Sequence, residues 1–204
     1  MNMDNNDCRG LVAIGTAASN ILIAGAPKQG KSTAVGIIVD RLKNCPKADG
    51  IRIISIDTAK PHLDADETLA SLCRELERRE DLRNVGVDIS GFPMIVTVVD
   101  EYSDLMDFGS RDFRRAVKEY VLRIAKEGPE AGMRMILSTR RPAQEVKALL
   151  EHFPTRMVFR VSDRKDSKML LKSEAAFWEL NGNGEMVLYD KGIISQCNIT
   201  SFIQ

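Results

Sequence analysis

The stretch NILIAGAPKQGKST, residues 20–33, constrains the fold more than any other part of the chain. Its opening NILIAG predicts a buried β-strand, and the segment from Gly30 to about Leu42 predicts the α-helix that follows. Between them lies a short loop with Gly25, Gly30 and an adjacent Lys31. The sequence thus predicts a strand–loop–helix unit, and the remaining segments have to pack around it.

Short apolar runs alternate with longer amphipathic segments along the rest of the chain. Further strands are predicted at 51–57, 94–101, 133–139 and 156–161, and helices at about 64–84, 111–126 and 143–152. The segments 184–190 and 192–203, which meet at Asp190-Lys191, predict a closing hairpin. The pattern indicates an α/β fold with a mainly parallel central sheet, helices on both faces and a C-terminal β-hairpin.

Length and charge limit the classes of protein to consider. The 204 residues fit a single domain, with a lead-in at 1–19 and a closing strand at 190–204. The 29 basic and 29 acidic residues cancel, which argues against coating nucleic acid with the whole surface but allows a local basic patch or pore lining. No apolar run approaches the roughly 20 residues that cross a bilayer, and the N-terminus is unlike a signal peptide. We therefore expect a cytoplasmic protein without a membrane segment in this chain.

Residues 25–32, GAPKQGKS, fit the pattern G-x-x-x-x-G-K-[ST] at every fixed position. Glycine tolerates the dihedral angles that point successive backbone N–H groups inward, and the following helix adds free N–H groups and the positive end of its dipole. Lys31 would reach the β- and γ-phosphates, and the Ser32 hydroxyl would take a Mg²⁺ position. An incidental glycine turn is the alternative, but the loop lies between a strand and a helix, as phosphate binding requires. The predicted ATP site comprises Gly25, Ala26, Pro27, Lys28, Gln29, Gly30, Lys31, Ser32 and Thr33.

Asp100 and Glu101 end the most hydrophobic predicted strand, MIVTVVDE. A carboxylate at the mouth of a buried sheet can hold Mg²⁺, and Asp100 fits that role. Glu101 is placed to polarise the attacking water as a general base. The alternative is that both acids simply begin a solvated loop. With a phosphate loop upstream in the same sheet, the pair favours ATP hydrolysis over phosphate transfer to a small acceptor.

The segments MIVTVVDEYSDLM, AGMRMILSTRRPAQEV, FPTRMVFRVSDRKDSKMLL and NGNGEMVLY carry a family resemblance. In this order, from about Asn20 to Tyr189, the chain resembles the motor domain of the FtsK/SpoIIIE DNA translocases, within the HerA–FtsK group of P-loop ATPases. The resemblance implies a RecA-like P-loop NTPase core that works as a homo-oligomeric ring, usually a hexamer. It also implies that ATP sits between neighbouring subunits while double-stranded DNA is moved through the central channel.

Two departures from the family pattern concern catalysis. The family usually has glutamine in its T-Q-R-P segment, where that residue senses the γ-phosphate; here the position is Arg140, which cannot accept a hydrogen bond from water. The segment commonly read as K-A-R-A-A-G is EGPEAG here, so an arginine that could serve a neighbouring subunit is missing. Arg123, Arg140 and Arg156 are the candidates to replace it.

Three functions therefore stay open at this point. The first is an ATP-hydrolysing motor subunit that translocates double-stranded DNA. The second is the ATPase domain of a protein-secretion motor, because secretion ATPases share these motifs. The third is a weakly active nucleotide-binding regulator, which the Arg140 departure suggests.

Two further segments have less specific predictions. The run RELERRE, residues 74–80, pairs opposite charges at helical spacing and predicts a solvent-exposed helix face. Phe177 and Trp178 predict burial in the core or in a subunit contact.

Overall fold

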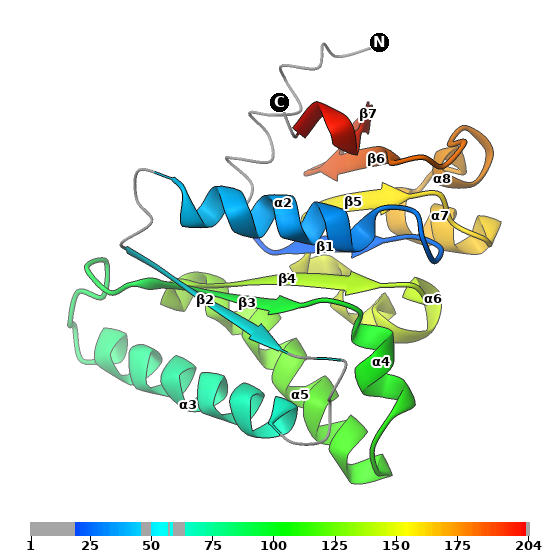
Figure 1. Cartoon of the computed structure of the whole chain (residues 1–204). Coiled ribbons are helices and arrows are strands. Elements are labelled where there is room, and N and C mark those ends of the chain that lie inside the picture. The colour runs from blue at the N-terminus through cyan, green and yellow to red at the C-terminus, as the bar shows by residue number, and fades with distance from the viewer. Residues whose placement is uncertain (1–18, 46–49, 57, 59–63, 203–204) are drawn as a thin grey trace.

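The computed structural model describes residues 19–45, 50–56, 58 and 64–202. Within these residues, seven strands form one sheet in the order β2-β3-β4-β1-β5-β6-β7 (Figure 1). The strands are β1 (Ile21–Ala24), β2 (Ile51–Ile56), β3 (Met94–Val99), β4 (Met133–Thr139), β5 (Thr155–Phe159), β6 (Glu185–Asp190) and β7 (Ile193–Asn198). Strands β1 to β5 are parallel to one another, whereas β6 pairs antiparallel with β5 and forms an antiparallel hairpin with β7 at the edge. The predicted fold class is confirmed.

Helices cover both faces of the sheet (Figure 1). The helices are α2 (Lys31–Lys43), α3 (Ala65–Asn84), α4 (Tyr102–Asp107), α5 (Arg111–Glu127), α6 (Pro142–Glu145), α7 (Arg164–Leu171) and α8 (Ala175–Trp178), with 3₁₀ turns η2 (Gly128–Ala131), η3 (Lys147–His152) and η4 (Ile199–Phe202). Helix α2 packs on one face, and α3 and α5 pack on the other. Because side chains alternate along a strand, Ile21 and Ile23 face α2 while Leu22 and Ala24 face the opposite core, and all four are fully buried.

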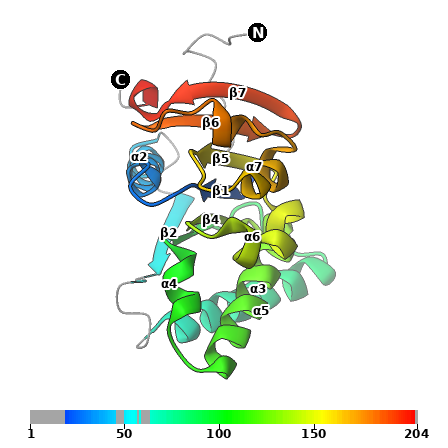
Figure 2. The same ribbon diagram turned by 90° about the vertical axis from the view of Figure 1, so that its right-hand side faces the viewer.

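The parallel strands end at a common edge, which Figure 2 shows from the front. Strand β4 lies between β1 and β3, with Thr139 beside Ala24 and Leu137 beside Val99. The loops that follow β1, β3 and β4 therefore meet at this edge, although they are far apart in the sequence. This is the usual position of a ligand site in a parallel sheet.

Two predicted elements differ from the structure. The helix expected at 143–152 is divided at Val146 into α6 and η3, because Val146 ends α6 and its carbonyl accepts the Leu149 N–H of the 3₁₀ turn. The closing strand expected at 190–204 ends at Asn198, since the Asn198 Oδ1 accepts bonds from the N–H and hydroxyl of Thr200 and so favours a turn. The expected lead-in at 1–19 lies outside the described residues except for Ser19.

The sequence did not predict the short helices α4, α7 and α8. Of the two predictions for Trp178, burial in the core is wrong, because the residue is 68% exposed and its indole donates a hydrogen bond to Glu174. A subunit contact stays a prediction. Phe177 does pack against the core, with the Trp178 ring edge-on to it at 4.7 Å between centroids. Within the described residues, no helix is long and apolar enough to span a membrane.

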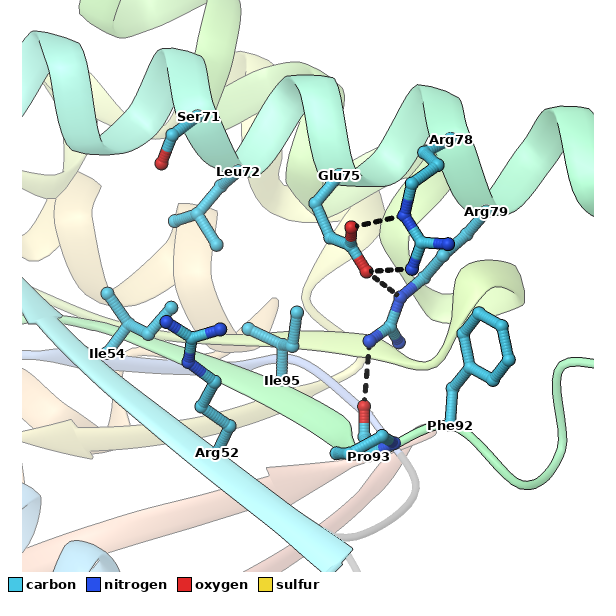
Figure 3. A pocket seen from close by; sticks show the side chains of 10 residues that line it. All are labelled: Arg52, Ile54, Ser71, Leu72, Glu75, Arg78, Arg79, Phe92, Pro93 and Ile95. Atoms are coloured by element: carbon cyan, nitrogen blue, oxygen red, sulfur yellow. Dashed lines mark hydrogen bonds and ion pairs between the residues drawn. The ribbon is translucent and has the colours of Figure 1, made fainter.

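Arg79 departs from the exposed face predicted for RELERRE, since it is only 3% exposed. Its guanidinium donates to Glu75 at 2.7 Å, to the Ala131 carbonyl at 3.0 Å and to the Pro93 carbonyl at 2.9 Å. Figure 3 shows this group at one end of a pocket of about 500 Å³ between α3 and strands β2 and β3. Hydrogen bonds from Arg78, and to a lesser extent from Arg79, lower the pKa of Glu75 to about 2. Arg79 thus links α3 to the segments that precede β3 and β4.

Replacing this buried arginine should destabilise the fold. Arg79→Ala removes the donor to the buried Ala131 carbonyl and to the Pro93 carbonyl, and it removes the partner of Glu75. We therefore expect the free energy of unfolding to fall by about 2–4 kcal/mol. The exposed Arg74 on the same helix is the matched control, and Arg74→Ala should change the free energy by no more than about 0.5 kcal/mol. Equal effects of the two substitutions in chemical denaturation would contradict the role given to Arg79.

Candidate active site

The loop between β1 and α2 is held in a conformation that only glycine allows at two positions. A Cβ on Gly25 would lie 2.7 Å from the Cβ of Phe159 in β5, so no side chain fits there. Gly30 has a φ of 106°, in the left-handed region, and a Cβ there would lie 3.3 Å from the Phe159 ring. The Ala26 N–H donates to the Arg160 carbonyl at 2.8 Å, which also fixes the loop against the end of β5. The strand–loop–helix unit predicted from the sequence is confirmed.

The start of α2 presents unpaired donors to this loop. The Ala34 N–H donates to the Gly30 carbonyl at 2.9 Å, so the N–H groups at 31–33 precede the first i→i−4 bond and have no partner within the helix. Ser32 and Thr33 are exposed in the same turn. Free N–H groups and the helix dipole together favour an anion at this end of α2.

Lys31 lies beneath the loop rather than in solvent, with only 6% of its surface exposed. Its Nζ donates to the Ala26 carbonyl at 3.2 Å and lies 3.7 Å from Oε2 of Glu101. Burial lowers the pKa of Lys31, while the nearby Glu101 and Asp100 carboxylates oppose that shift. The structure therefore brings together the phosphate-loop lysine and the acid pair that the sequence placed on another strand.

Ser138 of β4 orients the acid pair at the end of β3. Its hydroxyl donates to Oδ1 of Asp100 at 2.7 Å and accepts a hydrogen bond from the Glu101 N–H at 2.8 Å. Thr58 donates from its hydroxyl to the Asp100 carbonyl at 2.6 Å. No described residue donates to Oδ2 of Asp100, so that oxygen is available to a ligand. The sequence reasoning missed Ser138 and Thr58, although a hydroxyl at the end of the MILST strand was a visible signal.

Glu101 has an unusual backbone conformation, with a φ of 71° in the left-handed region. Oε2 of its carboxylate lies 3.7 Å from Nζ of Lys31, and Oε1 accepts a hydrogen bond from the Arg140 N–H at 3.0 Å. The side chain is 19% exposed, so a water molecule can reach it. Non-glycine residues with such a φ cost energy and are concentrated at functional sites.

The Arg140 side chain is held by two acids of α4. It lies 2.9 Å from Asp104 and 3.1 Å from Asp107, and Arg141 lies 2.6 Å from the same Asp107. The hydrogen bond from Arg141, followed by that from Arg140, lowers the pKa of Asp107. The backbone N–H of Arg140 thus contacts the acid pair through Glu101. Its side chain is 29% exposed, and the guanidinium is bound to α4.

The other two candidate arginines make contacts within the chain. Arg123 binds three carboxylates, those of Glu77 at 2.5 Å, Glu127 at 3.0 Å and Glu80 at 3.9 Å. These contacts place it between α3 and α5.

Arg156 is half-buried and donates to three backbone carbonyls, those of Phe153, Leu150 and Leu170, at 3.0, 2.9 and 2.6 Å. It also lies 4.7 Å from the centre of the Tyr189 ring. The guanidinium groups of Arg123 and Arg156 are therefore already bound by groups of the same chain.

A further, half-buried carboxylate adjoins the site and was not anticipated from the sequence. Glu145 of α6 accepts hydrogen bonds from the hydroxyls of Thr139 at 2.6 Å and Ser103 at 2.8 Å. Burial raises the pKa of Glu145, and these two hydroxyls counteract the shift. The contacts tie α6 and α4 to the end of β4, so the segment that carries Arg140 is anchored on both sides.

The residues present fit ATP and Mg²⁺. The loop and the first turn of α2 offer backbone donors to phosphate oxygens, and the exposed Ser32 hydroxyl and the available Asp100 oxygen are the hard oxygen ligands that Mg²⁺ prefers. Gly25, Ala26, Pro27, Lys28, Gln29, Gly30 and Thr33 form the rest of the loop and its helix entry.

No protein-family model matches the chain. The chain is 30% identical to the DNA translocase FtsK of Oceanobacillus iheyensis over 213 residues, which cover 85% of this chain and 27% of that protein. It is 29% identical to the DNA translocase FtsK of Streptococcus pyogenes over 208 residues, which cover 82% of this chain and 25% of that protein. The chain therefore spans about a quarter of the length of these relatives.

Solved structures share the fold at lower identity. The pCW3 conjugation coupling protein TcpA, in its monomer form with ATPγS, matches with a TM-score of 0.73 at 19% identity, over 90% of this chain and 60% of that one. The cytoplasmic domain of the type VII secretion ATPase EccC of Thermomonospora curvata matches with a TM-score of 0.69 at 19% identity, over 90% of this chain and 25% of that one. The genome packaging NTPase B204 of Sulfolobus turreted icosahedral virus 2, in complex with AMPPCP, matches with a TM-score of 0.57 at 17% identity. The match covers 89% of this chain and 97% of that one.

The Ser138 hydroxyl provides a direct test of the acid pair. Ser138→Ala removes the donor to Asp100 and the acceptor for Glu101, so turnover of Mg²⁺–ATP should fall about tenfold, with a smaller change in nucleotide affinity. Thr97 is a matched control, because its hydroxyl is buried on β3 without a hydrogen-bond partner. Thr97→Val should leave turnover unchanged. Equal turnover in both variants would show that Ser138 does not orient the acids.

Proposed function

Because this chain is an ATPase domain of the FtsK/SpoIIIE family, we propose that it hydrolyses ATP and uses the energy to move double-stranded DNA as a subunit of a homo-oligomeric ring in the cytoplasm. The observation that carries the proposal is the meeting of Lys31, Asp100, Glu101 and Arg140 at the end of adjacent strands. The sequence relatives that cover most of this chain are named as DNA translocases.

Binding of ATP would use the loop donors, Lys31, Ser32 and Asp100. Mg²⁺ would neutralise phosphate charge and would be held by the Ser32 hydroxyl and the Asp100 carboxylate. Lys31 would exchange its carboxylate neighbour for the β- and γ-phosphates. This exchange offsets the cost of burying the lysine, since phosphate carries more negative charge than Glu101.

The same exchange would prepare Glu101 for catalysis. Once Lys31 turns to the phosphates, Oε2 of Glu101 is released, while the Arg140 N–H still holds Oε1 and orients the carboxylate. Glu101 would then accept a proton from the attacking water and act as the general base.

Arg140 is the arginine best placed to contact the γ-phosphate in its own subunit. Its guanidinium would have to leave Asp104 and Asp107, and phosphate is a suitable competitor for those two acids. Arg123 and Arg156 would have to break the contacts described above before either could serve a neighbouring subunit of the ring.

A protein-secretion motor is the second candidate, favoured by the fold shared with EccC. DNA translocation is preferred because of the two relatives named as translocases and because B204, named a genome packaging NTPase, matches over 97% of its own chain. A weakly active regulator is the third candidate, for which the Arg140 departure remains the reason.

ATP turnover measured against increasing linear duplex DNA tests these candidates. We expect several-fold stimulation that weakens with added salt, because contacts to the DNA backbone are ionic. Lys31→Ala should lower turnover by about 100-fold or more, whereas Lys43→Ala, an exposed lysine in the last turn of the same helix, should not. Turnover indifferent to DNA would favour the secretion motor, and ATP binding without turnover would favour the regulator.

A further inference from the structure

The phosphate loop contacts a turn that lies about 150 residues later in the chain. This turn, residues 181–184 with the sequence NGNG, precedes β6. A Cβ on Gly182 would lie 2.8 Å from Oε1 of Gln29, in the middle of the loop. A Cβ on Gly30 would lie 3.7 Å from the Cα of Gly184. The loop therefore has the β5 residue Phe159 on one side and this turn on another.

The turn has an unusual backbone conformation and is hydrogen-bonded to neighbouring segments. Three successive residues, Gly182, Asn183 and Gly184, have φ values of 92°, 53° and 82°. The Gly182 carbonyl accepts the Glu185 N–H at 3.0 Å, and the Gly184 carbonyl accepts the Ile199 N–H at 2.8 Å. These bonds fasten the turn to the β6–β7 hairpin and to η4.

The contact between Gln29 and the turn is steric rather than polar. Oε1 of Gln29 is buried and has no hydrogen-bond partner among the described residues. A buried amide oxygen without a donor is unfavourable, so its position is imposed by packing. The side chain fits because Gly182 has no Cβ, and a Cβ there would force the end of the Gln29 side chain to move.

We propose that Gln29 is a positioning residue through which the 181–184 turn holds the phosphate loop in its binding conformation. The inference rests on the proposed function, because its effect is on ATP affinity. A loop that binds phosphate through several backbone N–H groups gains affinity when these groups are already aligned. The C-terminal hairpin, through this turn, thus becomes a determinant of nucleotide binding.

The test compares two glycines with similar φ angles. Gly192, in the β6–β7 turn, has a φ of 97° and no atom within 4 Å of an added Cβ. Gly182→Ala and Gly192→Ala therefore introduce similar backbone strain, but only the first pushes on Gln29. We expect Gly182→Ala to raise the KM for ATP and the Kd for a fluorescent ATP analogue on the order of tenfold, with kcat changed less. Gly192→Ala should leave both constants near the wild-type values.

Gln29→Ala supplies the second arm and does not depend on the fold tolerating Gly182→Ala. Alone, it should weaken nucleotide binding moderately, because the loop loses its support. In the Gln29→Ala background, adding Gly182→Ala should weaken binding no more than adding Gly192→Ala does, because the side chain that was displaced is gone. Additive effects of Gln29→Ala and Gly182→Ala on the Kd would overturn the inference, and so would equal Kd values for Gly182→Ala and Gly192→Ala. Neither result would contradict the proposed function, as long as the wild-type protein binds and hydrolyses ATP. Failure of the wild-type protein to bind ATP would overturn both.

Discussion

Strand β4 lies between β1 and β3, and the chemistry of the site depends on that position. From β4 the Ser138 hydroxyl reaches Asp100 and Glu101, and the Arg140 N–H just beyond its end reaches the Glu101 carboxylate. The other described contacts of the two acids are the Thr58 hydroxyl on the Asp100 carbonyl and the Lys31 ammonium near Glu101, whose φ is strained. Hydrogen bonds to ionised groups contribute about 1.5–3 kcal/mol each, so these contacts are strong enough to hold that strained geometry.

The Lys31–Glu101 pair follows from the same arrangement. A lysine that is almost fully buried needs a counter-charge, and β3 supplies one at 3.7 Å. Because phosphate groups carry more negative charge than one carboxylate, they can replace Glu101 as the neighbour of Lys31. In the proposed mechanism, the pair would couple nucleotide binding to the release of Glu101 as general base. The 181–184 turn, by holding Gln29, extends this coupling to the C-terminal hairpin.

Features encoded within short stretches could be predicted from the sequence, and features that depend on distant contacts could not. The phosphate loop and the Asp100–Glu101 pair were found because each is a local pattern next to an apolar strand. Ser138, Glu145 and the Gln29–Gly182 contact were missed, since each acquires its role from residues far away in the chain. The spacing of Arg79 from Glu75 predicts an exposed helical pair, whereas the Ala131 and Pro93 carbonyls that Arg79 binds come from other segments.

The central claim is that Glu101 activates water for hydrolysis while Lys31 and the loop bind ATP. The most direct measurement is the identity of the nucleotide bound to Glu101→Gln after incubation with Mg²⁺ and ATP. The account predicts that this variant binds ATP with near-normal affinity and retains it as ATP, with hydrolysis slowed about 100-fold or more. Bound ADP formed at the wild-type rate would contradict the account.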